Sequence, residues 1–229
     1  MMEITQLRRN PRIMRDIFEA ELAQLGDNLV QLSVKVHEAI VNAGEALLTA
    51  DVARAQQVIT ADDAIDELAR EADDRAVLLL AQQAPVATDL RIVVSALRMS
   101  ATLERMGDLA QHIAQVARRA YPSKAVPEDL TPVFSALQDA SVRLAKRLTR
   151  LLETRDIAEA NAIERDDDII DDLHQDTFAA LLGSHWEGTA QETIDITLVG
   201  RYYERFGDHG VSIARRVIYL VTGTDTQHV

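Results

Sequence analysis

The sequence has no cysteine among its 229 residues, and it is poor in glycine, proline and aromatic side chains. Without cysteine the chain can form neither a disulfide nor a thiolate metal site. Nine glycines, five prolines and an aromatic content of 4% leave few turn residues and few strand formers. This composition argues against a β-sheet protein and is typical of a helical bundle.

Long apolar segments are also missing. No uninterrupted apolar run approaches the roughly 18 residues that a membrane span requires, and no apolar signal segment follows the first residues. We therefore expect a soluble, cytoplasmic protein. The formal net charge of −13 argues against a nucleic-acid partner, because phosphate backbones require a basic face, but it leaves a cation as a partner open.

Apolar residues make up 47% of the chain, and they recur at helical spacing in six segments. The first 13 residues are basic, and we expect them to form a flexible extension outside the fold. Asp51 is a plausible N-cap for the second helix, which should end before Pro85. The expected helices cover about residues 14–48, 51–84, 88–120, 132–153, 157–182 and 189–221.

A cluster of three prolines between residues 121 and 132 divides the six expected helices into two sets of three. The sequence therefore predicts an all-α fold of two tandem three-helix bundles related by internal duplication. The bundles should cover residues 14–120 and 133–222, with a linker over residues 121–132.

One short motif occurs once in each half. The segment 103–108 reads Leu-Glu-Arg-Met-Gly-Asp, and the segment 203–208 reads Tyr-Glu-Arg-Phe-Gly-Asp. In each copy a Glu and an Asp stand four residues apart, so they share one face of a helix. The glycine before the Asp removes a side chain, which lets another helix or an ion come close.

A second pair of acids precedes each motif on the neighbouring helix. In the first half Asp62 and Asp66 stand four residues apart, and Pro85 lies midway between Asp66 and Glu104 and between Asp62 and Asp108. If the two helices fold back at this proline, residues equidistant from it become neighbours. The four carboxylates should then lie at one height of an antiparallel helix pair.

The same register recurs in the second half. The midpoint of Asp171 and Glu204 falls between residues 187 and 188, and so does the midpoint of Asp167 and Asp208. This point lies inside the break between Gly183 and Gly188, where we expect the chain to turn. The sequence thus predicts two acid quartets of the same design.

Four carboxylates on helices about 8–10 Å apart repel one another, so they must protonate, pair with arginine or hold cations. An all-oxygen site favours hard ions such as Fe(III), Mn, Mg or Ca, and it admits Zn; more than two carboxylates suit a bridged cluster. Three histidines near the acids are weaker candidate ligands, for which a solvent-facing position is the more ordinary interpretation: His112, His174 and His209. The arginines that offer the competing, purely structural neutralisation are Arg91, Arg98, Arg105, Arg201 and Arg205.

The chain from about residue 14 to 222 resembles the PhoU family, the bacterial regulators of phosphate transport and phosphate-starvation signalling. The segments that carry the resemblance are 84–91 (Ala-Pro-Val-Ala-Thr-Asp-Leu-Arg), 103–108, 164–173 and 201–214. The resemblance implies two three-helix bundles with multinuclear iron or zinc clusters. Its implied metal ligands are Asp62, Asp66, Glu104 and Asp108 in the first cluster and Asp167, Asp171, Glu204 and Asp208 in the second.

The sequence departs from the family pattern at a few of these positions. Asp62 and Asp167 are a methylene shorter than Glu, which affects how they would bridge two metal ions. His112 and Ser212 stand where the family often has Asn. These differences bear on the nuclearity and the identity of the metal more than on the presence of a site.

The resemblance also implies a role without catalysis. Such proteins act as negative regulators that connect the Pst phosphate ABC transporter, through its ATPase subunit, to the PhoR-type sensor histidine kinase. They are often homodimers, and they stay peripheral to the membrane through these partners. Two alternatives remain open. One is a carboxylate-bridged di-iron oxidase or ferroxidase, for which only Asp171 and His174 approximate the expected Glu-x-x-His motif; the other is a metal-free helical scaffold.

Overall fold

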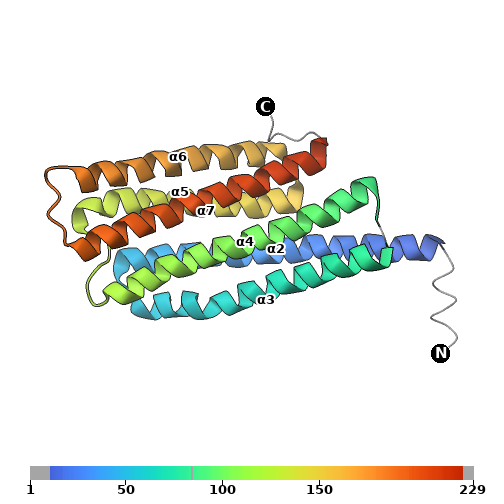
Figure 1. Cartoon of the computed structure of the whole chain (residues 1–229), viewed down its shortest axis with the longest axis horizontal. Helices are drawn as coiled ribbons and strands as arrows, with labels where there is room; N and C mark the ends of the chain where they lie inside the picture. The colour runs from blue at the N-terminus through green and yellow to red at the C-terminus, as the bar shows by residue number, and fades with distance from the viewer. Residues whose placement is uncertain (1–10, 84, 224–229) are drawn as a thin grey trace.

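The computed structural model describes residues 11–83 and 85–223, and this part of the chain consists of six long α-helices without any strand (Figure 1). The predicted all-α class is therefore confirmed. The helices are α2 (Pro11–Thr49), α3 (Val52–Gln83), α4 (Ala87–Ala120), α5 (Thr131–Thr154), α6 (Ile157–Leu182) and α7 (Ala190–Thr222), with a short 3-10 turn, η1 (Glu128–Leu130), before α5.

The first helix begins earlier than the sequence analysis expected. Helix α2 starts at Pro11 rather than at residue 14, because proline is tolerated in the first turn of a helix, where its missing N–H would have no partner. Residues 11–13 of the expected extension thus belong to the helix. Residues 1–10 lie outside the described residues.

Side-chain caps fix several helix ends close to where the sequence predicts them. The Asp51 carboxylate accepts a hydrogen bond from the Arg54 backbone N–H at 3.0 Å, as expected for the N-cap of α3. At the start of α7 the Thr189 hydroxyl accepts from the Glu192 N–H at 3.2 Å, and the Glu192 carboxylate accepts from the Thr189 N–H at 2.7 Å. This reciprocal capping box stabilises the helix end that follows the Gly183–Gly188 break.

The helices form two three-helix bundles that pack against each other. Helices α2, α3 and α4 make the first bundle, and α5, α6 and α7 make the second. The two bundles meet along α2 with α5 and along α4 with α7, while α3 and α6 lie at opposite edges of the molecule (Figure 1). Buried side chains of both bundles, Leu32, Ile40, Leu103, Leu137 and Phe206 among them, belong to one continuous hydrophobic core.

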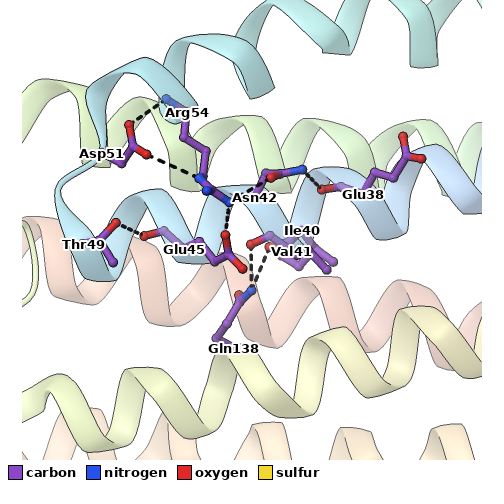
Figure 2. A network of polar contacts seen from close by, with 9 residues as sticks. All are labelled: Glu38, Ile40, Val41, Asn42, Glu45, Thr49, Asp51, Arg54 and Gln138. Atoms are coloured by element: carbon purple, nitrogen blue, oxygen red, sulfur yellow. Dashed lines mark hydrogen bonds and ion pairs between the residues drawn. The ribbon is translucent and has the colours of Figure 1, made fainter.

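A buried polar junction joins α2 to the second bundle. The Gln138 side chain of α5 donates to the backbone carbonyls of Ile40 and Val41 on α2 at 3.0 and 3.2 Å, as Figure 2 shows. Its amide oxygen accepts from the Tyr203 hydroxyl of α7 at 2.9 Å. Because a buried polar group without a partner is costly, this satisfied network fixes how the two bundles dock.

Helices α4 and α7 run antiparallel along the second seam. Arg119 of α4 pairs with Asp195 of α7, and the His112 ring lies 5.2 Å from the Tyr202 ring between their centroids. From the first contact to the second, the residue number falls by seven on α4, from 119 to 112, and rises by seven on α7, from 195 to 202. Continuing this register for five more residues places Gly107 level with Gly207, so the two repeated motifs lie at the same height of the seam.

The connection between the bundles runs over residues 121–130, and α5 already begins at Thr131. Pro132 therefore lies in the first turn of α5, as the expected helix over residues 132–153 has it, and the linker is shorter than the expected 121–132. No helix within residues 11–83 or 85–223 is long and apolar enough to cross a membrane.

Candidate metal centres

The first acid quartet comes together where α3 packs against α4. Asp62 is 6% exposed, and its neighbours in the quartet are Asp66, Glu104 and Asp108. Burial, together with the charges of Asp108, Asp66 and Glu104, raises the pKa of Asp62 to about 6. Burial and the charges of Asp108 and Asp66 also raise the pKa of Glu104. The predicted register therefore places all four carboxylates within electrostatic reach of one another.

The second quartet forms in the same way between α6 and α7. Burial, together with the charges of Asp171, Asp208 and Glu204, raises the pKa of Asp167 to about 7. The pKa values of Asp171 and Glu204 are also raised, in both cases mainly by burial. Half-buried carboxylates that raise one another's pKa are held in an unfavourable state, which a cation would relieve.

The glycine of each motif allows the acid of the neighbouring helix to approach the backbone. A Cβ atom on Gly207 would lie 2.2 Å from Oδ1 of Asp167, and a Cβ on Gly107 would lie 2.9 Å from Cγ2 of Ile65 and 3.4 Å from Oδ1 of Asp62. A side chain at either position would occupy the space that the carboxylate or its neighbour fills. The glycines are therefore required for close helix approach at the height of the acids.

Other buried acids in the same helices are neutralised by arginine, and the quartets differ from them. Asp166, beside Asp167, accepts from Arg143 at 3.3 Å and from Arg147 at 2.8 Å. Asp195 of α7 likewise pairs with Arg119 across the seam. These pairs show what ordinary structural neutralisation looks like in this fold.

The quartets have little such compensation. Among the ion pairs within the described residues, only the one between Arg201 and Glu204 involves a quartet acid. In the first quartet the Gln111 side chain donates to Oδ2 of Asp62 at 2.5 Å. In the second, Oδ1 of Asp167 and Oε2 of Glu204 are buried and have no hydrogen-bond donor in the described structure. Neutralisation by arginine, the structural alternative, therefore accounts for one acid of the eight.

One further acid, Asp73, lies beside the first quartet and is not among the residues predicted from the sequence. Asp73 lines an open cavity of about 380 Å³ together with Asp66 and Glu104, and its charge contributes to the raised pKa of Glu104. Its Oδ1 atom is buried without a hydrogen-bond partner. Asp73 follows Asp66 by seven residues, which is two helical turns, so the spacing that revealed Asp62 and Asp66 could also have revealed it.

The three histidines lie in two different environments. His112 contacts Tyr202 on the seam between α4 and α7, and His209 lies on the same seam, where burial and the charges of Arg205 and Arg105 lower its pKa. His174 instead packs against Gly200, and Asp171 is close enough to influence its pKa, which burial and Arg201 lower. His209 is likewise close enough to Asp208 for that charge to act on its pKa, so His174 and His209 both lie beside quartet acids. His174 is buried, contrary to the solvent-facing position expected.

The carboxylates of a quartet do not surround a common point. Within the described ranges, no three His, Asp or Glu side chains are arranged so that they could hold a metal ion as they stand. The quartet acids nevertheless fit a hard cation, because all the ligand atoms they offer are carboxylate oxygens. Two of these oxygens are buried and accept no hydrogen bond, and the motif glycine leaves space beside them.

The fold and the two quartets define a class: all-helical proteins built from a duplicated three-helix unit, with an acid quartet on the corresponding helix pair of each copy. Comparison with known proteins places the chain in that class more specifically. The model of the PhoU domain matches residues 29–117 and again residues 134–217. The chain belongs to the PhoU family.

Individual relatives agree with this assignment. The chain is 40% identical over 210 residues to the phosphate-specific transport system accessory protein PhoU homolog 2 of Mycobacterium tuberculosis, which covers 92% of this chain and 99% of the relative. It is 39% identical to PhoU homolog 1 of Mycobacterium leprae, with 92% and 95% covered. The crystal structure of PhoU from Pseudomonas aeruginosa superposes with a TM-score of 0.83 at 27% identity, and covers 90% of this chain and all of that one.

Proposed function

We propose that this protein is a metal-binding cytoplasmic regulator of phosphate uptake and phosphate-starvation signalling. In this proposal it acts as a negative adaptor between the ATPase subunit of the Pst transporter and a PhoR-type sensor kinase, and it works as a homodimer. The relatives named as accessory proteins of the phosphate-specific transport system support the regulatory part. The observation that carries the metal part is the pair of register-matched, largely uncompensated carboxylate quartets.

The proposal gives each quartet the same task. Asp62, Asp66, Glu104 and Asp108 would hold one cluster, and Asp167, Asp171, Glu204 and Asp208 would hold the other. A multinuclear iron or zinc cluster would supply positive charge that joins two helices of a bundle. The protein's own contribution is to fix the helix register, through the cores and the motif glycines, so that the acids face one another.

The metal part is tested by metal content per chain. The double variant Asp62→Asn/Asp66→Asn should lose the metal of the first cluster and retain that of the second. A matched control is Asp63→Asn/Glu67→Gln, which removes the same charge from exposed positions of the same helix and should keep the full content. Elemental analysis of protein purified without chelator and incubated with iron or zinc would decide. Equal metal content in the two variants would refute the assignment of ligands.

The regulatory part requires a separate measurement in cells. In a host that lacks its own copy, the protein should repress a phosphate-starvation reporter when phosphate is plentiful, and the Asp62→Asn/Asp66→Asn variant should repress it less. Co-purification with the transporter ATPase and with the kinase would identify the partners. Full repression by a variant without any metal would separate the regulatory role from the clusters.

The di-iron oxidase is the competing class, and the position of His174 beside Asp171 is the observation in its favour. An adaptor should bind ferrous iron without turnover. An oxidase should consume oxygen repeatedly, and a His174→Ala variant should slow that reaction. Oxygen uptake with ferrous iron in excess therefore distinguishes the two classes.

A further inference from the structure

An arginine-lined cavity lies at one end of the seam between the two repeats. It has a volume of about 440 Å³, which is in the range of small-molecule sites, about 300–1,000 Å³. Helix α4 contributes its first turns and α7 its last turns, and these ends lie together in Figure 1. The lining residues are Ala87, Leu90, Arg91, Val94, Ser95, Arg98, Arg215, Arg216 and Tyr219.

Four of the described lining residues are arginines and none is acidic. The Arg91 guanidinium stands over the Tyr219 ring, 5.2 Å from its centroid, and its Nε atom is buried without a hydrogen-bond partner. Arg98 forms no ion pair with any residue that the structure describes. Arg215 contacts Glu164 through Nε alone, at 3.3 Å. Positive charge is thus concentrated here, and that of Arg91 and Arg98 is poorly compensated, in a chain whose net charge is −13.

The other end of the same seam shows how this fold neutralises an arginine. The motifs of the two repeats are 100 residues apart, so Ser95 corresponds to Asp195 and Tyr219 corresponds to Arg119. At that end Asp195 is buried and pairs with Arg119. At the cavity the buried Ser95 stands at the position that corresponds to Asp195. This position therefore provides no carboxylate to neutralise the arginines.

We propose that this cavity binds a small molecule that carries two or more linked phosphate groups. Guanidinium groups match phosphate oxygens with two parallel hydrogen bonds, and Arg91 and Arg98, which form no ion pair within the described residues, leave positive charge in the cavity that an anion would balance. A single phosphate would leave much of that charge and volume unfilled. Because the arginines come from both α4 and α7, the ligand would bridge the two repeats. This site is distinct from the acid quartets and goes beyond the proposed function.

Calorimetric titration of the full chain, freed of metal with chelator, tests the proposal with pyrophosphate, ATP and orthophosphate as probes. Pyrophosphate or ATP should bind more tightly than orthophosphate. Arg91→Gln and Arg98→Gln should each weaken that binding about tenfold or more, because each removes a charge-assisted hydrogen bond. Ser95→Asp should abolish it by supplying the acid present at the other end. Tighter binding of ATP than of pyrophosphate identifies a nucleotide, and equal binding identifies the phosphate chain.

Two control variants define the site. Arg118→Gln removes an exposed arginine from the opposite end of α4, where it contacts Gln56, and should change affinity less than about twofold. Glu104→Gln/Asp108→Asn disables the first quartet and should leave binding intact, which separates this proposal from the metal clusters. Thermal melts of each variant establish that it is folded.

Three results would overturn the proposal. The first is no heat of binding with any probe at millimolar concentration. The second is equal weakening by Arg118→Gln and Arg98→Gln, which would mean diffuse attraction to the whole surface. The third is that vesicles of phosphatidylglycerol bind the protein through Arg91 and Arg98 while the soluble probes do not, which would assign the arginines to a membrane surface.

Discussion

The two acid quartets occupy equivalent positions in the two repeats, but the side chains around them differ. In the first repeat Gln111 donates a hydrogen bond to Asp62, whereas the corresponding position in the second repeat is Val211. Asp167 accordingly keeps a buried oxygen without a donor, and burial together with the neighbouring carboxylates raises its pKa to about 7. The pKa of Asp62 rises only to about 6.

The helix pairs also differ in how they fill the space one turn away from the acids. In the first repeat the Ser100 hydroxyl donates to the Ala69 carbonyl at 3.1 Å. In the second repeat His174 fills the place of Ala69, and Gly200 replaces Ser100, so that a Cβ there would lie 3.1 Å from the imidazole. In the second repeat the large His174 of α6 is thus accommodated by the small Gly200 of α7.

The comparison shows that the four acids depend on the helix register, which both repeats share, while their neighbours set the electrostatics of each site separately. The first quartet gains Asp73 and an open cavity. The second gains the Arg201 ion pair and the buried His174. We therefore expect the two sites to differ in metal affinity and in response to pH, and the following predictions test that difference.

Removal of metal should have the largest effect. A ligand that binds only the folded state at a thousand times its Kd stabilises it by about 4 kcal/mol, and each kcal/mol corresponds to about 2–4 °C for a chain of this size. Thermal unfolding of the metal-loaded protein should therefore shift down strongly in chelator. Chelator should lower the unfolding temperature less in a variant that has lost one quartet. The two variants to compare are Asp62→Asn/Asp66→Asn and Asp167→Asn/Asp171→Asn. A chelator effect that persists in full when both pairs are replaced would show that the quartets do not bind the metal.

Alanine at the two motif glycines should separate packing from metal binding. Gly107→Ala places a methyl group against the core side chain of Ile65, so it should lower the free energy of unfolding by about 1–3 kcal/mol. Gly207→Ala meets the end of the Asp167 side chain, which can rotate away, so its main effect should be loss of metal from the second site. Denaturant unfolding of metal-free protein and metal analysis together measure both effects. Equal stability losses in the two variants would contradict this distinction.

The pH dependence of metal-free protein should come mainly from the second quartet. The pKa of Asp167 is about 7 in the folded protein, against about 3.9 for an unfolded chain. Between these values the folded state binds more protons, so the free energy of unfolding should fall as pH rises. Asp167→Asn should remove this slope, raising stability at pH 8 by about 1–2 kcal/mol after allowance for solvent screening at a half-buried site.

Asp168→Asn is the matched control: it removes the neighbouring exposed charge, which raises the pKa of Asp167 less than burial does, and should lower the slope only slightly. Chemical unfolding at several pH values, in chelator, gives the slope for each variant. A stability that rises with pH in the metal-free wild type would show that Asp167 is not the group responsible.

The smallest expected effect concerns the hydrogen bond that the first quartet alone possesses. Gln111→Leu removes the donor to Asp62, and a donor favours the charged carboxylate, so the midpoint of Asp62 titration should rise toward that of Asp167. The change should be about one pKa unit or less, corresponding to about 1 kcal/mol. Carboxyl chemical shifts followed by NMR would measure it. An unchanged midpoint would mean that burial alone sets the difference between the two sites.

Much of this arrangement was predictable because it depends on local rules. Apolar spacing, the Asp51 cap and the glycine break before Thr189 locate helix ends to within a few residues. An antiparallel helix pair with a known turning point relates residues by simple symmetry. Equal distances from Pro85 were therefore enough to bring Asp62 to the height of Asp108.

The rest depends on which face of one bundle meets the other. His112 lies four residues after Asp108, which suggested a place beside the first quartet. It contacts Tyr202 on the seam instead, and this contact joins residues about 90 positions apart in the sequence, which local spacing does not reveal. The arginines suggested as partners of the acids illustrate the same limit. Arg91 and Arg98 line a cavity at the end of the seam and do not neutralise the quartets.

The amino-acid sequence by itself determined the six helices, the duplication and the meeting of four acids in each half, because helical periodicity and chain reversal are local properties. The tertiary structure alone decided which acids are neutralised. Asp166 reaches two arginines of α5, while its neighbour Asp167 faces α7 beside a glycine and has none. One residue along a helix turns a side chain by about 100°, and only the packing of the bundles shows what lies in each direction.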